Sequence, residues 1–179
     1  MEKIRAMRAR MDDLSPEERI HAFFELDEPS DQRFTSSFIS KEVTLQSLEF
    51  PAKPYIAKAT FTFRVPRYYC NASGNLHGGA QSFAYDMLTS MAMQATAGKP
   101  GGVPAIWLDG GVSRVLTVNY LLPAPEGTDL IVECEVTNAG KSLAMTRGIL
   151  KRADTGAIIS TCEHNKAAVK GGKPGWAKM

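Results

Sequence analysis

Short segments in which apolar and polar residues alternate occupy most of the second half of the chain. Such alternation is typical of strands that bury one face. Between residues 57 and 65, for example, Ala59, Phe61 and Phe63 alternate with basic or hydroxyl side chains. The pattern predicts strands at residues 43–49, 57–65, 113–122, 130–137, 143–152 and 157–168. The last four follow one another without a helix, and Asp154-Thr155-Gly156 predicts a hairpin turn between the final two.

One long helix is predicted between the second and third strands, from about residue 79 to residue 97. Phe83, Met87 and Met91 recur at four-residue spacing, and other apolar side chains cover most of the remaining circumference. A helix that is apolar nearly all round has to be buried, so it should lie at the centre of the fold. One sheet and one buried helix predict an α+β architecture in which an antiparallel sheet wraps around the helix. The exposed edges of such a sheet favour pairing with a second subunit.

The first fifty residues have a different texture. Ser15 and Glu18 flank a predicted helix start, because Ser15 can accept from a free backbone N–H and Glu18 can reach back to the cap. That helix should end near Glu28-Pro29, and a connector should follow up to Lys41. The chain is therefore interpreted as an N-terminal helical extension (1–42), a main domain (43–169) and a C-terminal tail (170–179).

Composition narrows the classes of function. The net charge of +2 predicts neither nucleic-acid nor membrane binding by bulk electrostatics. The longest weakly charged stretch, residues 78–98, contains too many polar groups for a membrane span. The cysteines (Cys70, Cys134 and Cys162) lack CxxC spacing, and no signal peptide is recognisable, which together favour a reducing compartment and a cytoplasmic protein. The basic first ten residues leave mitochondrial targeting as the alternative.

Asp86 is the only charged residue between Gly78 and Gly98, inside the helix predicted to be buried. An ionised carboxylate in apolar surroundings is costly unless it is hydrogen-bonded or paired. On a helical wheel it lies beside a narrow strip of hydroxyl residues, namely Ser82, Thr89 and Ser90. The residues alone are compatible with a catalytic acid or with a structural hydrogen-bond network.

The segment before the helix carries a second candidate site. Gly78 and Gly79 open the helix, so a ligand can approach its free N–H groups, where the helix dipole favours negative charge. This is how an oxyanion site is built, and Asn71 or His77 could add a donor, although a helix cap is the simpler interpretation of His77 taken alone. Asp86 lies seven residues beyond Gly79, about 10 Å along the helix. Both groups could act on one carbonyl only if two subunits share the site.

The pattern Asn71-x-x-Gly74-x-x-His77-Gly78-Gly79, followed by Asp86, resembles the phenylacetate-type and thioesterase-superfamily-member branch of the hotdog acyl-CoA thioesterases. The resemblance continues through Ser113 and the following strand to residues 123–124, and then through the hairpins at 140–144 and 155–156. It covers about residues 43–168 and leaves the N-terminal extension outside. The loop at 99–111, with Trp107 and Asp109, is longer than usual for the family, which implies a reshaped acyl pocket.

The resemblance implies a hotdog fold and a site divided between the two subunits of a homodimer, with two dimers forming a tetramer. Asn71 and the backbone N–H of Gly78, with His77 nearby, would polarise the thioester carbonyl. Asp86 would act as general base or, less readily, as nucleophile, and Ser113 would hold the water. CoA would lie along the interface as part of the substrate, so no separate cofactor is expected. The candidate ligands of its phosphates are Lys141, Arg147 and Lys166.

The predicted reaction is hydrolysis of a fatty or aromatic acyl-CoA to CoA and the free acid. A non-catalytic acyl-CoA binding module on the same fold is the main alternative, and the presence of both Asp86 and Ser113 favours the enzyme over it. A hydratase or dehydratase would pair a histidine with its acid, but no histidine follows Asp86 in the helix. No metal site is expected, because His21, His77 and His164 lack paired-ligand spacing.

Overall fold

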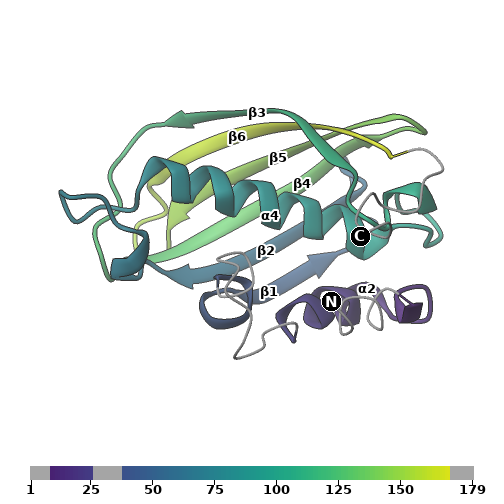
Figure 1. The fold of residues 1–179 in the computed structure, drawn as a ribbon, viewed down its shortest axis with the longest axis horizontal. Coiled ribbons are helices and arrows are strands. Elements are labelled where there is room, and N and C mark those ends of the chain that lie inside the picture. Colours follow the sequence, from purple (N-terminus) through teal and green to yellow (C-terminus); the bar gives the residue numbers. More distant parts are fainter. Residues whose placement is uncertain (1–8, 26–37, 170–179) are drawn as a thin grey trace, which may run out of the picture.

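The computed structural model describes residues 9–25 and 38–169 (Figure 1). The helices are α2 (Pro16–Phe24) and α4 (Gly78–Thr96), with short helical turns at Phe38–Glu42, Arg67–Tyr69 and Ala105–Trp107. The strands are β1 (Thr44–Glu49), β2 (Ala57–Arg64), β3 (Val112–Tyr120), β4 (Asp129–Ala139), β5 (Leu143–Arg152) and β6 (Ile158–Ala167). The predicted strands and the long helix are all present, with ends within two residues of the predicted positions. The predicted helix end at Glu28-Pro29 and most of the connector lie outside the described residues.

The strands form one antiparallel sheet in the order β1-β2-β4-β5-β6-β3. In Figure 1 the sheet lies behind α4, and the helix runs along the strands with β3 above it and β1 below it. The 19 residues of α4 span about 28 Å. The α+β architecture with an antiparallel sheet around one central helix, the hotdog arrangement expected from the resemblance, is therefore confirmed.

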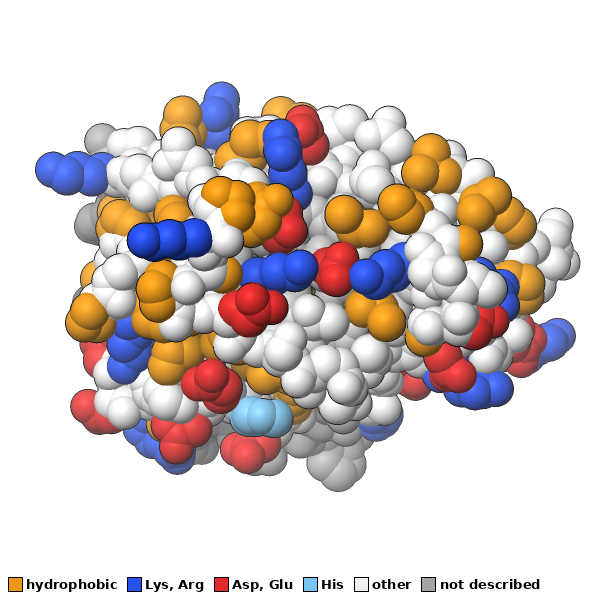
Figure 2. Space-filling view, turned by 180° about the vertical axis from the view of Figure 1, so that it is seen from behind, with side chains coloured by type: hydrophobic (Ala, Val, Ile, Leu, Met, Phe, Trp, Pro, Cys, Tyr) orange, Lys and Arg blue, Asp and Glu red, His pale blue; other side chains and the backbone are white. Residues whose placement is uncertain are grey.

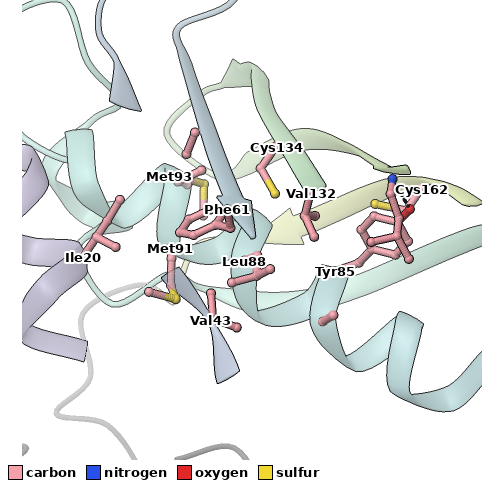
Figure 3. Packing of buried hydrophobic residues seen from close by; sticks show 14 of the residues in the cluster. Ile20, Val43, Phe61, Tyr85, Leu88, Met91, Met93, Val132, Cys134 and Cys162 are labelled. Atoms are coloured by element: carbon pink, nitrogen blue, oxygen red, sulfur yellow. Dashed lines mark hydrogen bonds between the residues drawn. The ribbon is translucent and has the colours of Figure 1, made fainter. Parts of the chain in front are cut away.

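The core lies between α4 and the inner face of the sheet (Figure 3). Leu88 and Met93 from α4 pack in the same cluster as Phe61 from β2 and Val132 from β4, and each of these side chains is fully buried. Gly148 on β5 permits this packing, because a Cβ atom there would lie 2.6 Å from the ring of Tyr85. The apolar stripe predicted for the helix is thus largely plain core, as the burial of Met91 also shows.

The N-terminal helix α2 packs against the C-terminal end of α4. It has the predicted capping box, in which Ser15 accepts from the backbone N–H of Glu18 and donates its own backbone N–H to the Glu18 carboxylate. Arg19 is buried, and its guanidinium donates to the carbonyl oxygens of Met11 and Ala97 at 2.6 Å each. The last carbonyl oxygens of a helix have no partner within the helix. A buried guanidinium can donate to them, and its positive charge interacts favourably with the negative end of the helix dipole.

The two faces of the sheet differ in character. Figure 2 shows the face opposite α4, where side chains of both charges are spread over the surface. On this face Glu133 of β4 pairs with Lys151 of β5 at 2.9 Å and with Lys58 of β2 at 3.8 Å. Such alternation of a buried and a charged face fixes the register of each strand, because a slip by one residue would bury the charges.

Strand β3 is an open edge of the sheet, since only β6 pairs with it among the described strands. Large apolar side chains are about half exposed along β3 and just after it, including Val115 (53% exposed), Tyr120 (52%) and Leu121 (57%). An apolar edge strand is a natural site for pairing with another chain.

Candidate active site

Asp86 lies midway along α4 with a half-exposed side chain (42%), rather than buried as the apolar helix predicted. Its Oδ1 accepts a hydrogen bond of 2.6 Å from the hydroxyl of Ser113, the second residue of β3. Its Oδ2 makes no hydrogen bond with the described residues. The fold therefore joins the two residues that the sequence proposed as base and water holder, 27 positions apart in the chain, and leaves one carboxylate oxygen available.

A kink in β3 aims Ser113 at α4. Ser113 and Tyr120 are seven residues apart and would face opposite sides of a regular strand. The pairing with β6 shifts by one residue between Ser113 and Val115, so both Ser113 and Tyr120 contact α4. Gly111 allows the chain to enter β3 here. Its φ of +62° suits glycine, and a Cβ would lie 2.5 Å from a neighbouring carbonyl oxygen.

Two residues of β6, His164 and Lys166, complete the network around Asp86. Nε2 of His164 lies 2.9 Å from the Ser113 oxygen, and Nδ1 lies 2.8 Å from the hydroxyl of Thr89. Nζ of Lys166 donates to Ser90 at 2.9 Å and to Ser113 at 3.3 Å. The hydroxyl strip predicted beside Asp86 is therefore bonded to the sheet and does not face solvent.

The role of His164 was missed from the sequence, although strand alternation contains the signal. Ser160, Cys162, His164 and Lys166 alternate with more exposed residues and are all buried, so β6 turns them toward α4. The prediction from the sequence considered a histidine partner for Asp86 only within the helix of Asp86 itself. Packing brings one from a strand instead.

Burial, with a smaller contribution from the charge on Lys166, lowers the pKa of His164 to about 4, while Asp86 acts in the opposite direction. The ring is therefore neutral near pH 7 and carries one proton. Thr89 donates its one hydroxyl proton to the carbonyl oxygen of Tyr85 at 2.7 Å, so Nδ1 of the neutral ring donates to Thr89 and Nε2 carries no proton. Ser113 donates to Asp86 at 2.6 Å, and Nε2 lies 2.9 Å from the same hydroxyl as a second acceptor. The 3.4 Å approach of Nε2 to Asp86 is then not an ion pair.

The second predicted half-site lies at the start of α4. His77 is the helix cap, because its Nδ1 accepts from the backbone N–H of Gly79 at 2.9 Å. Oδ1 of Asn71 accepts from the backbone N–H groups of Ser73 and Asn75, which orders the preceding loop. The remaining donors are the side-chain amide of Asn71, the backbone N–H of Gly78 and, in a neutral ring, Nε2 of His77. None of these donors is hydrogen-bonded within the part of the chain that the structure describes.

The two half-sites do not meet within one chain. Gly78 and Asp86 are eight residues apart on α4, which separates them by about 12 Å along the helix axis. Strand β3 contacts both. Ser113 bonds Asp86, while the hydroxyl of Tyr120 donates to the carbonyl oxygen of Gly78 at 3.0 Å.

The three candidate phosphate ligands lie in different environments and do not form one site. Lys141 is exposed at the turn between β4 and β5, and Arg147 lies on the outer face of the sheet, 3.3 Å from Glu163. Lys166 is only 3% exposed and faces α4. Unlike Lys141 and Arg147, Lys166 is therefore not on a solvated face of the sheet. A buried ammonium that donates to two serines is not placed to bind an external phosphate.

The long loop between α4 and β3 is anchored by Trp107. Its indole is fully buried, and its Nε1 donates to the carbonyl oxygen of Gly140 at 2.8 Å. The tryptophan thus fixes the loop to the β4–β5 turn, and it supplies no surface on which an acyl chain could lie.

Two other kinds of feature are absent from the described residues. No group of three or more histidine, cysteine, aspartate or glutamate side chains is arranged to hold a metal ion in residues 9–25 and 38–169. Nor does any helix in those ranges have the length and apolar character needed to cross a membrane.

An antiparallel sheet around one central helix that carries an acid and a glycine-rich start defines a hotdog-fold protein. Comparisons with known proteins specify the family. A model of the thioesterase superfamily matches residues 73–159. The human protein named acyl-coenzyme A thioesterase 13 is 32% identical over 109 residues, which is 61% of this chain and 71% of the relative, and the Pongo abelii protein of that name matches equally. The chain belongs to the thioesterase superfamily.

Solved structures support the fold independently. Zebrafish thioesterase superfamily member 2 superposes with a TM-score of 0.68 at 24% identity, covering 87% of this chain and 99% of that one. The Escherichia coli PaaI protein of the phenylacetic acid degradation operon gives a TM-score of 0.65 at 16% identity, covering 87% and 94%. At these identities the superpositions establish the fold alone.

Proposed function

We propose that this protein hydrolyses acyl-CoA thioesters to CoA and the free acid, with Asp86 as the general base. Its relatives named acyl-coenzyme A thioesterase 13 support the reaction class. Hotdog neighbours support CoA as the ligand: a Streptococcus pneumoniae thioesterase protein was solved with coenzyme A, and a Streptococcus mutans protein with acetyl CoA. Fatty or aromatic acyl groups are the proposed substrates, as the family resemblance implies.

The Asp86–Ser113 contact is the observation that carries the proposal. The 2.6 Å bond from Ser113 fixes the carboxylate on Oδ1 and leaves Oδ2 to bind water. A general base has to be partly desolvated and still reachable by water, and the half-exposed Asp86 beside a buried network meets both conditions. Water would attack the thioester carbon while its proton passes to Oδ2. Collapse of the tetrahedral intermediate then breaks the C–S bond, and the CoA thiolate takes up a proton.

The helix start supplies the proposed oxyanion site. The N–H of Gly78 and the side-chain amide of Asn71, with Nε2 of His77 nearby, are donors without partners in the described chain. Donors at a helix N-terminus stabilise the negative charge that develops on the carbonyl oxygen. Asn71 suits the role because the loop uses its oxygen and leaves its NH₂ group available.

A homodimer formed through β3 would bring the two half-sites together. If two copies of β3 pair antiparallel about a twofold axis, the Ser113 end of one strand lies beside the Tyr120 end of the other. Ser113 touches Asp86 and Tyr120 touches Gly78, so the base of one copy meets the oxyanion donors of its partner. The exposed apolar side chains of β3 favour this pairing. The dimer of dimers implied by the resemblance stays a prediction.

A free-thiol release assay over acyl-CoAs of different chain length tests the function. We expect Asp86→Asn to lower kcat by about 10²-fold or more, the usual scale for loss of a general base. Asp129→Asn is the matched control, because Asp129 is a surface acid (63% exposed) paired with Arg64. Activity that survives in Asp86→Asn would remove Asp86 from the mechanism. Tight acyl-CoA binding without thiol release in the unaltered protein would favour the binding module.

A further inference from the structure

Lys166 is the one fully enclosed ammonium group in the neighbourhood of Asp86, and the mechanism above gives it no task. It is 3% exposed on β6, opposite Ser113 in the register of β3. Burial lowers its pKa, and Asp86 opposes that shift. Burying a cation is costly unless its protons are hydrogen-bonded and a counter-charge lies near. The hydroxyl oxygens of Ser90 and Ser113 each accept a hydrogen bond from the ammonium, and Asp86 is the nearby counter-charge.

The bonding capacity of Ser113 links Lys166 to Asp86. A serine hydroxyl has one proton and two lone pairs. Lys166 donates to one lone pair at 3.3 Å. The single proton has two acceptors within reach, Asp86 at 2.6 Å and Nε2 of His164 at 2.9 Å, and it is directed at the nearer one, Asp86. Ser113 therefore joins the ammonium of Lys166 to the carboxylate of Asp86.

We propose that Lys166 is a positioning residue, whose ammonium acts through Ser113 to keep the Asp86 carboxylate oriented for attack. The inference rests on the proposed function and deepens it. The titratable groups that face Lys166 are Asp86 from α4 and His164 on its own strand. His164 is neutral, so Lys166 supplies the only positive charge among the three. Oδ2 then remains the single oxygen of the pair that can bind the water.

Lys166→Met is the primary variant, because it keeps the aliphatic stem and removes the charge. Loss of the ammonium leaves no fully buried charge behind, because Asp86 is half exposed and Ser113 is exposed, so the melting temperature should change little. We expect kcat to fall about tenfold or more through loss of orientation, with KM changed little. Lys58→Met on the outer face is the control.

A double variant separates positioning from a purely structural role. In a Ser113→Ala background, Lys166→Met should change kcat by less than about twofold, because the connecting hydroxyl is already absent.

An equal loss of kcat with and without Ser113 would overturn the role of Lys166. So would a loss of activity that merely follows a lower melting temperature. Absence of thiol release from the unaltered protein would instead refute the proposed function.

Discussion

The division of the site between two subunits can be tested by mixing two inactive variants. Asn71→Ala removes an oxyanion donor and Asp86→Asn removes the base, so each homodimer has two damaged sites. In a mixed dimer, the intact Asp86 of the first variant faces the intact Asn71 of the second. The other site of that dimer carries both substitutions. One working site is therefore regenerated for each mixed dimer.

The size of the recovery follows from the geometry. Random exchange of equal amounts puts about half of the subunit pairs into mixed dimers, and each has one working site of two. Activity should therefore return to about a quarter of the unaltered protein's value, well above the residual level of either variant. If Asp86 and Asn71 acted within one chain, despite the roughly 12 Å between Gly78 and Asp86 along α4, mixing would restore nothing.

The assay is thiol release after the two variants are unfolded and refolded together, or incubated until subunit exchange is complete. Exchange is followed separately by native mass spectrometry or by fluorescence transfer between labelled copies. The matched control mixes Asp86→Asn with Ser113→Ala. Both residues belong to the same half-site, so their mixed dimers regenerate no intact site. Full exchange without recovery in the first mixture, or equal recovery in both mixtures, would refute the shared site.

Two further predictions concern stability. Arg19→Met should lower the free energy of unfolding by about 3 kcal/mol or more, because two short charge-assisted hydrogen bonds are lost, one to Met11 and one to Ala97 at the end of α4. The exposed Arg64→Met should cost at most about 1 kcal/mol. Urea unfolding measures both free energies. A change of more than about twofold in the kcat of Arg19→Met at 25 °C would show that α2 contributes to catalysis. His164 is neutral when folded, with a pKa of about 4 against 6.5 when exposed, so its contribution is present above pH 6.5 and is lost as pH falls to 4. The loss of stability between pH 7 and pH 4 should be about 3 kcal/mol smaller in His164→Gln, and equal losses would show that His164 is not held neutral.

The fold was predictable because the signals for its elements are local. Alternation in β2 and β4 and the apolar circumference of α4 each reflect one buried face, and burial is what the structure shows. The cap of α2 was predictable for the same reason, since Ser15 and Glu18 are three residues apart. The helical turn at Phe38–Glu42, within the predicted connector, carries no comparable local pattern and was missed.

The site was predictable only in part, because its network depends on register and packing. The motif identified Asp86 and Ser113, and the structure joins them. His164 and Lys166 reach Asp86 from β6 through a pairing that shifts between Ser113 and Val115, and the sequence does not mark that shift. Lys166 was accordingly interpreted as a surface ligand for phosphate. A basic residue in an alternating strand is normally exposed. Lys166 instead lies on the buried face of β6, which it shares with Ser160 and Cys162.

The edge strand β3 links assembly to chemistry in a way that neither half-site shows alone. One end of β3 supplies the hydroxyl that orients Asp86. The other end supplies Tyr120, whose ring lies so close to Gly78 that a Cβ added to this glycine would be 3.3 Å from the ring. The side chains between them are those left exposed for a second copy. Because the same strand contacts the base, the oxyanion donors and the proposed partner, any change in its register would move both half-sites at once. The proposed dimer contact and the catalytic geometry therefore depend on the same strand. Val115→Lys opposes strand pairing without touching Asp86. This substitution should abolish hydrolysis while leaving the folded subunit intact. An active monomeric Val115→Lys protein, identified by light scattering and thiol release, would contradict this coupling.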